Sequence, residues 1–302
     1  MPRFDDRAAL WLALPAVFVL IWSTGFVVAR FGMPHASPMG FLAWRYLFSL
    51  LAFAVWIRLS RAVWPLGRVQ WAHLALTGVL MHAGYLGGVW AAVKLGLGAG
   101  TAALIVGLQP VLTALWLSGR MGVQSVTLRQ WIGLVLGFGG LLLVVWQKLG
   151  AGEVTPMNLA LALFALLCIT SGTLYQKRYV APCDVRTANA VQLLAALAVT
   201  APLALIEAGR MELHAELIGA MAWSVLVLTL GGSSLLYLLI QRGATTRVAS
   251  LMYLVPPCTA LLAWQLFDEP LSGLVLAGLA VTAVGVALVV RDPVRDPVRV
   301  PT

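Results

Sequence analysis

The strongest constraint on this chain is a series of apolar runs, each long enough to cross a lipid bilayer as a helix. Such a helix needs about 20 predominantly apolar residues. Short segments with glycine, proline and charged residues, which are typical turn signals, separate the runs. The runs cover residues 10–29, 40–57, 71–93, 100–118, 128–146, 157–176, 187–206, 216–240, 247–267 and 273–290. The pattern predicts an all-α polytopic membrane protein with ten transmembrane helices.

The composition excludes a soluble fold. Hydrophobic residues make up 61% of the 302 residues, charged residues make up 10%, and the mean hydropathy is +0.93. Soluble domains are about half apolar and about a quarter charged. Because ten crossings leave no room for a folded domain outside the membrane, we expect the function to reside among the helices.

The positive charges are distributed as membrane topology requires. The net charge is +9, but Lys and Arg occur one to three at a time between the apolar runs. A nucleic-acid partner would call for a basic face or stripe, so none is expected. With a cytoplasmic N-terminus, 15 of the basic residues fall on the cytoplasmic side and four on the other, with Arg45 inside a span. This bias predicts that both termini are cytoplasmic.

The cysteines give no sign of a metal site or a disulfide framework. Cys168, Cys183 and Cys258 lie far apart and show no paired spacing. We expect no metal and no cofactor.

The two halves of the chain resemble each other. At a constant offset, residues 99–144 align with 245–290 without gaps, and Pro110 pairs with Pro256. Several small and aliphatic residues match along the same alignment. The aligned prolines and the ungapped length indicate an internal duplication.

The duplication predicts two units, residues 1–150 and 151–302, with five spans in each. Five is an odd number, so the second unit enters the membrane in the opposite orientation. Inverted repeats are typical of alternating-access transporters, whose substrate site lies between the repeats near the middle of the bilayer.

Polar and aromatic side chains inside the spans are candidates for lining a cavity, because polar groups that face lipid are costly. His82 and Tyr85, spaced i and i+3, share one helix face beside several glycines. The alternative for each serine or threonine is a hydrogen bond within its own helix, and for His82 a packing contact. The candidate substrate-binding residues are Trp22, Ser23, His82, Tyr85, Gln109, Thr170, Ser171, Tyr175, Ser233, Tyr237 and Tyr253.

Prolines fall inside the fourth and ninth spans at repeat-related positions. Proline lacks a backbone donor, so it kinks a helix and exposes carbonyl groups. We expect Pro110, Pro256 and Pro257 to act as gating or kink positions, with a static packing kink as the alternative.

Two further charged positions allow more than one role. Arg45 lies inside the second span near the non-cytoplasmic side, where it can snorkel to the interface or pair with a substrate carboxylate. Asp268-Glu269-Pro270 falls in the turn between the last two spans. There we expect a cap on the final helix or a pair with a nearby cation.

No acidic residue lies deep in any predicted span. The usual carboxylate for coupling to protons or sodium is therefore missing. His82, the one histidine deep in a span, is the candidate proton carrier. Facilitated diffusion or exchange is expected at least as much as proton coupling through this residue.

Several segments resemble signatures of the EamA family in the drug/metabolite transporter superfamily. In chain order they are Ile21-Trp22-Ser23-Thr24-Gly25-Phe26-Val27-Val28-Ala29-Arg30, Ala43-Trp44-Arg45-Tyr46, Gly98-Ala99-Gly100-Thr101-Ala102-Ala103, Gln109-Pro110-Val111-Leu112-Thr113-Ala114, Val255-Pro256-Pro257 and Phe267-Asp268-Glu269-Pro270-Leu271. Each motif is loose, whereas their order is specific and covers essentially the whole chain. Arg120-Met121-Gly122 departs from the family, which often has a glutamate there that matches Glu269.

The resemblance implies a carrier of ten helices, arranged as two inverted five-helix repeats, in a bacterial inner membrane. Members of the family commonly export amino acids or related metabolites, as the YddG-type amino-acid exporters do. It also implies a central cavity built mainly by the first, third, fourth, sixth, eighth and ninth helices.

The function predicted from the sequence is export of small metabolites across the membrane by alternating access through a central cavity. A cavity rich in Trp, Tyr, Ser and Thr with few fixed charges favours amino acids, including aromatic and other apolar ones. Sugars, nucleosides and drug-like compounds are the alternative cargo. An intramembrane enzyme is the alternative from another class, with Gly231-Gly232-Ser233-Ser234 as its nucleophile motif and His82 as its base.

Overall fold

The computed structural model of the chain describes residues 5–121, 127–207, 209, 211–232, 235 and 254–290. These residues form helices joined by short connections, and none of them forms a strand, which confirms the predicted all-α architecture. In chain order the α-helices are α1 (Asp5–Gly32), α2 (Pro38–Ser60), α3 (Arg68–Gly78), α4 (Tyr85–Lys94), α5 (Ala99–Val106), α6 (Gln109–Met121), α7 (Leu128–Gly150), α8 (Pro156–Tyr179), α9 (Val185–Glu207), α10 (Ala215–Ala222), α13 (Val255–Phe267) and α14 (Gly273–Val290). Two π-helices, η1 (Val79–Gly84) and η2 (Trp223–Gly232), continue α3 and α10.

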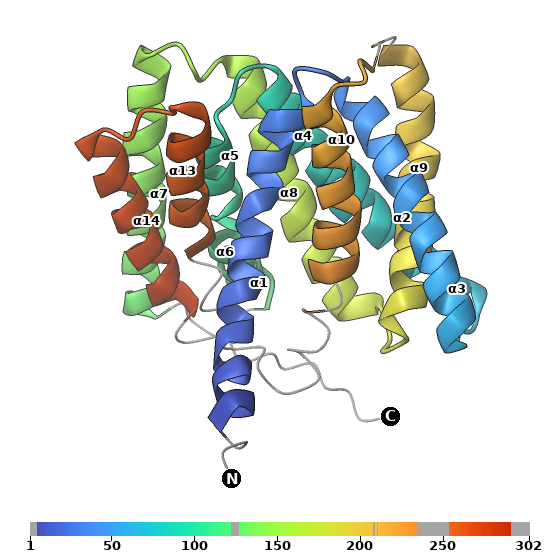
Figure 1. Ribbon diagram of the computed structural model, residues 1–302. Coiled ribbons are helices and arrows are strands. Elements are labelled where there is room, and N and C mark those ends of the chain that lie inside the picture. The colour runs from blue at the N-terminus through green and yellow to red at the C-terminus, as the bar shows by residue number, and fades with distance from the viewer. Residues whose placement is uncertain are drawn as a thin grey trace.

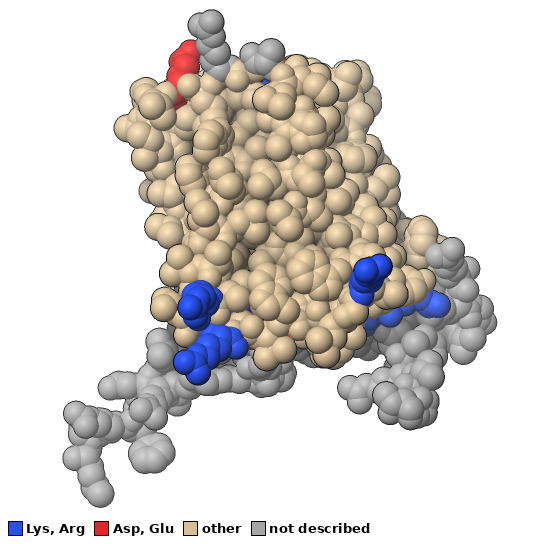
Figure 2. Space-filling view, turned by 90° about the vertical axis from the view of Figure 1, so that its right-hand side faces the viewer, with Lys and Arg blue, Asp and Glu red and all other residues tan. Residues whose placement is uncertain are grey.

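The described helices lie on the predicted spans, and their lengths divide them into two groups. Within the described residues, six helical segments are long and apolar enough to cross a membrane: Pro38–Ser60, Arg68–Lys94, Leu128–Gly150, Pro156–Tyr179, Val185–Glu207 and Ala215–Gly232. The four other predicted spans overlap the shorter apolar helices Ala16–Gly32, Ala99–Thr113, Val255–Phe267 and Gly273–Val289. The face drawn in Figure 2 is a broad uncharged band, with basic side chains near one end and an acidic group at the other.

The helices form one bundle whose long members run roughly side by side (Figure 1). Helices α7 and α14 form one flank, α2, α3 and α9 form the other, and α1, α4, α5, α8 and α10 lie between them. We call the end where α1 begins the basic end, because α2, α8 and α9 place Arg58, Lys177, Arg178 and Arg186 there. The other end is called the opposite end.

Side-chain caps fix where two of the spanning helices begin. Thr127 accepts the backbone N–H of Gln130 at 3.3 Å, and Gln130 Oε1 accepts the backbone N–H of Thr127 at 3.0 Å. Thr155 and Asn158 form the same reciprocal pair at the start of α8. Such capping boxes satisfy backbone donors that the first helical turn leaves without partners. They explain why α7 and α8 start directly after the polar breaks in the sequence.

Glycines allow α7 and α14 to pack backbone against backbone. A Cβ atom on Gly133 would lie 2.6 Å from the carbonyl oxygen of Gly285, and one on Gly140 would lie 2.5 Å from that of Gly278. Small residues at a helix contact permit this approach, which supplies van der Waals packing where lipid removes the hydrophobic driving force. Gly139, next in sequence to Gly140, has no atom within 4 Å of its Cβ position.

We expect Gly140→Ala to destabilise the protein by about 1–3 kcal/mol, because the new methyl group must push α14 away. Gly139→Ala is the matched control and should leave stability unchanged or raise it slightly, since alanine favours a helix. The thermal unfolding midpoint of each purified variant in detergent measures the difference. Equal midpoints for the two variants would contradict the close packing of α7 on α14.

The fourth predicted span is broken, and this corrects the expected mid-helix kink at Pro110. Helix α5 ends at Val106, Gly107 and Leu108 form a turn, and α6 begins at Gln109. Pro110 is thus in the first turn of α6, where a missing N–H costs no hydrogen bond. Pro256 and Pro257 likewise occupy the first turn of α13. The discontinuity therefore precedes Pro110, since proline starts a helix more readily than it continues one.

Candidate functional site

Two adjoining cavities lie among the helices of the bundle. The first has a volume of about 120 Å³, and we call it the arginine chamber. It is lined by Trp22, Gly25, Phe26, Arg45, Met81, His82, Tyr85, Leu86, Val89, Trp90, Ile169, Leu228 and Thr229. These residues come from α1, α2, η1, α4, α8 and η2. The chamber is lined mostly by apolar residues, and its polar side chains include those of Arg45, His82 and Thr229.

The second cavity, the proline chamber, has a volume of about 90 Å³. Its lining includes Gln109, Pro110 and Pro256, together with residues of α1, α4, α5, α8 and α13. Both chambers share the residues Trp22, Phe26, Tyr85 and Ile169. These four side chains therefore form the partition between two neighbouring spaces. Together the chambers draw on the six helices that the sequence resemblance implied, and on α2 as well.

Arg45 supplies the one cationic side chain among the residues of the arginine chamber. It is 7% exposed, so it does not snorkel to the bundle surface, which was one of its two expected roles. Its Nε and Nη2 atoms donate to Thr229 Oγ1 at 3.4 and 3.2 Å. Thr229 in turn donates to the carbonyl oxygen of Ser224 at 2.8 Å. None of the ion pairs in the described part of the chain includes Arg45.

The third span brings His82 and Tyr85 to the arginine chamber, and Tyr85 also borders the proline chamber. The hydroxyl of Tyr46 donates to the His82 carbonyl oxygen at 2.9 Å, and the two rings meet edge to face with centroids 6.0 Å apart. Stacked behind them, Phe41 and Trp90 have ring centroids 4.3 Å apart. This aromatic packing holds the π-helical turn of η1 against the cavity.

Both π-helices border the arginine chamber. Met81 and His82 come from η1, while Leu228 and Thr229 come from η2. The wider π-helical turn lets Thr229 bond to the carbonyl five residues before it and turns its hydroxyl toward Arg45. Single π-turns inside helices are frequent at functional sites.

In the proline chamber, a hydrogen bond and a close contact join elements from both halves of the chain. Gln109 Nε2 donates to Thr173 Oγ1 at 2.9 Å, which links α6 to α8. A Cβ atom on Gly107 would lie 2.8 Å from Cγ of Pro256, so the break after α5 packs on the first turn of α13. Pro257 borders a separate, smaller cavity beside α14.

Other predicted site residues lie away from both chambers. The hydroxyls of Ser23 and Thr170 donate to carbonyl oxygens four residues earlier, at 2.8 and 2.7 Å. Ser23 is fully buried, and its carbonyl accepts the Thr259 hydroxyl at 3.1 Å, so it joins α1 to α13. Ser171 is exposed on the surface of α8. Ser233, Tyr237 and Tyr253 lie outside the described residues.

Tyr175 is placed near the basic end of the bundle. Its hydroxyl lies 2.7 Å from His73 Nδ1, and its ring contacts that of Tyr179 with centroids 4.7 Å apart. It borders neither chamber. The contact ties the end of α8 to α3.

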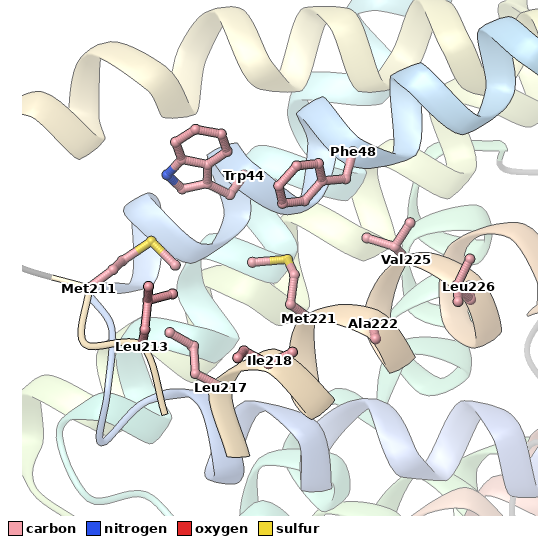
Figure 3. A pocket seen from close by; sticks show the side chains of 10 residues that line it. All are labelled: Trp44, Phe48, Met211, Leu213, Leu217, Ile218, Met221, Ala222, Val225 and Leu226. Carbon is pink, nitrogen blue, oxygen red and sulfur yellow. The ribbon is translucent and has the colours of Figure 1, made fainter. Parts of the chain in front are cut away.

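A larger apolar groove lies between α2 and α10 (Figure 3). It has a volume of about 590 Å³ and is lined by Trp44, Phe48, Met211, Leu213, Leu217, Ile218, Met221, Ala222, Val225 and Leu226. Many of these side chains are exposed on the flank of the bundle. The lining offers the Trp44 indole as its only polar side-chain group. A polar solute would gain little there, so the groove is suited to lipid chains rather than to a polar substrate.

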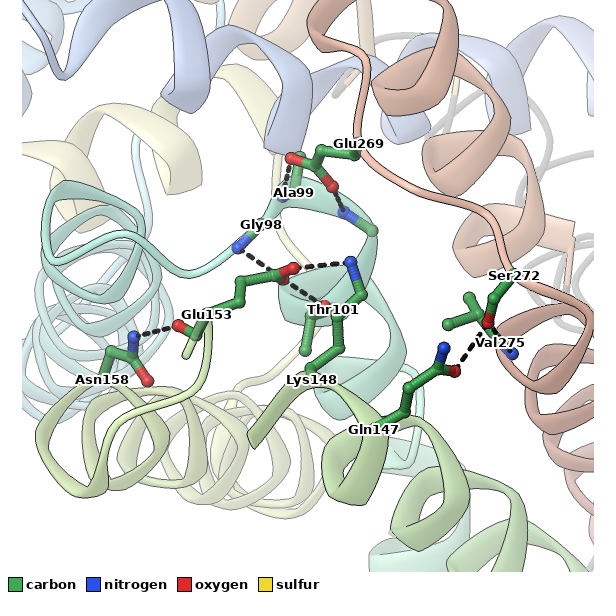
Figure 4. A network of polar contacts seen from close by, with 11 residues as sticks. Gly98, Ala99, Thr101, Gln147, Lys148, Glu153, Asn158, Glu269, Ser272 and Val275 are labelled. Carbon is green, nitrogen blue, oxygen red and sulfur yellow. Dashed lines mark hydrogen bonds and ion pairs between the residues drawn. The ribbon is translucent and has the colours of Figure 1, made fainter. Parts of the chain in front are cut away.

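At the opposite end, two carboxylates hold the start of α5 (Figure 4). Glu269 Oε1 accepts the backbone N–H of Ala99 at 2.9 Å, and its Oε2 accepts that of Gly100 at 3.4 Å. The expected cap on the final helix is therefore wrong, because the turn folds back over α5. Ser272 instead caps α14 by accepting the backbone N–H of Val275 at 3.2 Å.

Glu153 completes this network from the connection between α7 and α8. It accepts the Thr101 hydroxyl at 2.8 Å and the Gly98 backbone N–H at 3.1 Å. Its other oxygen pairs with Lys148 at 2.5 Å (Figure 4). Carboxylates at a helix N-terminus are favoured by the helix dipole and by the unpaired N–H groups. The network therefore joins α7, the turn after α13 and the start of α5 at one point.

The amino-acid sequence matches a known transporter family in two consecutive regions. The model of the EamA-like transporter family matches residues 7–146 and again residues 157–291. The chain belongs to the EamA-like transporter family. It is therefore a multi-pass membrane transporter of small molecules and not an enzyme.

Relatives of this EamA protein span nearly its whole length. A "Probable amino-acid metabolite efflux pump" of Salmonella typhimurium is 25% identical, with 94% of each chain covered. A protein of Escherichia coli with the same name is 23% identical, also with 94% of each chain covered. "Uncharacterized transporter YvbV" of Bacillus subtilis is 27% identical, with 94% of this chain and 91% of the relative covered.

A solved crystal structure, described only as that of a protein, shares the fold of this EamA chain. The two structures superpose with a TM-score of 0.61, and their sequences are 18% identical. The superposition covers 91% of this chain and 95% of the other. At this identity the likeness shows the fold alone.

Two polar residues that line the arginine chamber of this EamA protein, Arg45 and Thr229, were not among the predicted substrate-binding residues. The sequence allowed two roles for Arg45, because a long side chain near the end of a span can reach the membrane interface or point into the bundle. Thr229 carried no signal, because its inward direction depends on the π-helical turn that begins at Trp223. Apolar spacing does not reveal such a turn.

Proposed function

We propose that this transporter exports amino acids with aromatic or other apolar side chains. The observation that carries the proposal is Arg45, a buried guanidinium that lines a cavity and forms no ion pair among the described residues. A buried cation without a counter-ion is costly. A substrate carboxylate would supply that counter-ion and suits the planar fork of arginine.

The remaining lining suits the rest of an apolar amino acid. Phe26, Val89 and Ile169 offer apolar surface to a side chain, and the rings of Trp22 and Tyr85 can hold an ammonium group by cation–π contact. With Arg45 as its one cationic side chain, the lining does not favour phosphorylated cargo. The proposed substrate-contacting residues are Trp22, Arg45, His82, Tyr85, Gln109 and Thr229.

Alternating access between two inverted repeats is the proposed mechanism. It is supported by the two matches to one family model, each of which spans five predicted helices. The proposed repeats are residues 1–150 and 151–302, and the contact of Gly107 with Pro256 lies between them. We place the hinge at this contact, with Pro110 beside it. The reason is that the helix of the first repeat is interrupted at Gly107, and α13 of the second repeat begins next to Pro256.

The basic end is proposed to face the cytoplasm of a bacterial cell, with the protein in the inner membrane and both termini on the cytoplasmic side. The bacterial sources of the relatives support this placement. No acidic side chain lines either chamber in the described residues, so we propose facilitated diffusion or exchange rather than proton coupling.

Counterflow in proteoliposomes tests the proposed cargo. Vesicles loaded with unlabelled solute should accumulate the same labelled solute when it is phenylalanine or leucine, and not when it is a sugar or a nucleoside. Accumulation should be the same with and without a pH gradient. Sugar or nucleoside counterflow without amino-acid counterflow would reject the proposal.

His82 is expected to contact the substrate directly. We expect His82→Gln to weaken apparent affinity for phenylalanine about fivefold, which corresponds to a net hydrogen bond of about 1 kcal/mol. His73→Gln is the matched control, because His73 bonds Tyr175 near the basic end and lines neither chamber. The concentration dependence of counterflow gives both affinities, and equal values for the two variants would remove His82 from the site.

A further inference from the structure

Two histidines and a glutamate converge at the opposite end of the bundle, away from both chambers. His35 Nε2 lies 3.0 Å from Glu216 Oε2, and His214 Nδ1 lies 3.9 Å from the same oxygen. The three ligand atoms lie within 4.8 Å of one another. The two imidazole rings are nearly parallel, with centroids 4.2 Å apart. Two of the four histidines in the chain thus meet a carboxylate at one point.

The backbone holds this cluster in place. His35 lies in the connection between α1 and α2, and its carbonyl oxygen accepts the backbone N–H of Glu212 at 2.9 Å. A second bond, from the backbone N–H of Met39 at the start of α2 to the Glu207 carboxylate at the end of α9, has a length of 2.9 Å. His214 and Glu216 lie at the start of α10, beside that connection (Figure 1). The three donors therefore come from two segments that the fold already fixes together.

The donors fit a divalent ion of the zinc class. Two imidazoles and one carboxylate form a known zinc ligand set, with a fourth position left for water. Tetrahedral ligands at zinc distances are about 3.3 Å apart, close to the 3.0 and 3.9 Å found here. His214 Nδ1 accepts the backbone N–H of Glu216 at 3.4 Å, and this long hydrogen bond must break before the nitrogen can coordinate an ion.

The side chains also have room to reach an ion. The side chain of His214 is 54% exposed and that of Glu216 is 50% exposed, whereas that of His35 is 18% exposed. Coordination requires the stacked rings to turn out of their parallel arrangement. His214, whose side chain is more exposed than that of His35, is the residue expected to make this turn.

We propose that His35, His214 and Glu216 form a zinc-binding site at the opposite end of this transporter. The bound ion joins the connection after α1 to the start of α10, and so links the two regions that separately match the family model. No pattern in the sequence indicates this site, because His35 lies far along the chain from His214 and Glu216. The site does not depend on which solute the protein carries.

Isothermal titration calorimetry with Zn²⁺ tests the site on full-length protein purified in detergent without a histidine tag. We expect one Zn²⁺ per chain and a higher thermal unfolding midpoint with the ion than without it. His35→Ala and His214→Ala should each weaken binding at least about tenfold, as loss of a ligand requires. With Co²⁺, the wild-type protein should show the visible absorption of a tetrahedral site.

Matched variants separate this site from adventitious binding. His73→Ala removes a histidine near the other end of the bundle, and Glu212→Gln removes a nearby carboxylate outside the cluster. Both should bind Zn²⁺ as the wild-type protein does. Circular dichroism and monodispersity of every variant without metal show that it is folded. Absence of binding in the wild-type protein, or unchanged binding when His35 and His214 are both alanine, would overturn the proposal.

Discussion

Replacement of Arg45 by methionine is expected to reduce the apparent affinity for phenylalanine by about 10- to 100-fold. The guanidinium is the proposed partner of the substrate carboxylate, and a hydrogen bond to a charged group is worth about 1.5–3 kcal/mol. Methionine keeps the length of the side chain without its charge. The measurement is the concentration dependence of phenylalanine counterflow in proteoliposomes.

The same variant should not be less stable than the wild-type protein. Arg45 is 7% exposed and has Thr229 as its hydrogen-bonded partner, without an ion pair in the described residues. Removal of a buried, uncompensated charge is neutral or favourable. A structural role for Arg45 would instead lower the thermal unfolding midpoint together with transport.

Two controls sharpen the Arg45 experiment. Arg45→Lys keeps the charge and loses the fork geometry, so it should retain part of the affinity. Arg30→Met removes an arginine of α1 that lies over the ring of Phe267 at 6.0 Å and lines neither chamber. It should transport normally. Normal affinity in Arg45→Met would contradict the proposed site.

Replacement of Glu269 by glutamine is expected to destabilise the protein by about 2–3 kcal/mol. The carboxylate is 9% exposed and accepts two backbone N–H groups at the start of α5. Glutamine keeps one acceptor oxygen and places an NH₂ group against a backbone donor, which leaves a buried group unsatisfied. The favourable interaction of the charge with the helix dipole is lost as well.

The neighbouring Asp268 provides the control for Glu269. Asp268 is exposed and has a left-handed backbone with φ of 54°, which asparagine also tolerates. Asp268→Asn should therefore leave the thermal unfolding midpoint unchanged. If Glu269→Gln and Asp268→Asn unfold at the same temperature as the wild-type protein, the carboxylate does not hold α5.

The sequence predicted the helices well because membrane-spanning helices impose a length and a composition that are visible locally. Within the described residues the ten apolar runs coincide with helices, with a break at Gly107 and Leu108 in the fourth. Parts of the eighth and ninth runs lie outside the described residues. Caps such as Thr127 with Gln130 are local signals too. The break at Gly107 was not predicted, because proline shows where a helix cannot continue without showing whether it bends or restarts.

The lining of the chambers was predicted less completely. Trp22, His82 and Tyr85 line the arginine chamber. For His82 the reason is that an ionisable group within a span rarely faces lipid. Ser23 and Thr170 do not line it, since a hydroxyl can bond to its own helix and then needs no other partner. Spacing along one helix does not distinguish these cases.

Contacts between distant segments lay beyond prediction. Glu269 was expected to act on its own neighbours, yet its partners Ala99 and Gly100 are far away along the chain. His35 and His214 meet only because the fold places the connection after α1 beside α10. Such pairs depend on the packing of whole helices, which no local pattern encodes.

The proposed function depends on recognition of the substrate carboxylate by the buried Arg45. Its most direct test is parallel counterflow of phenylalanine and phenethylamine, which differ by that carboxylate, in wild-type and Arg45→Met proteoliposomes. We predict that the wild-type protein accumulates phenylalanine and not phenethylamine, and that Arg45→Met loses this preference. Equal accumulation of both solutes by the wild-type protein, or an unchanged preference in the variant, would contradict the proposal.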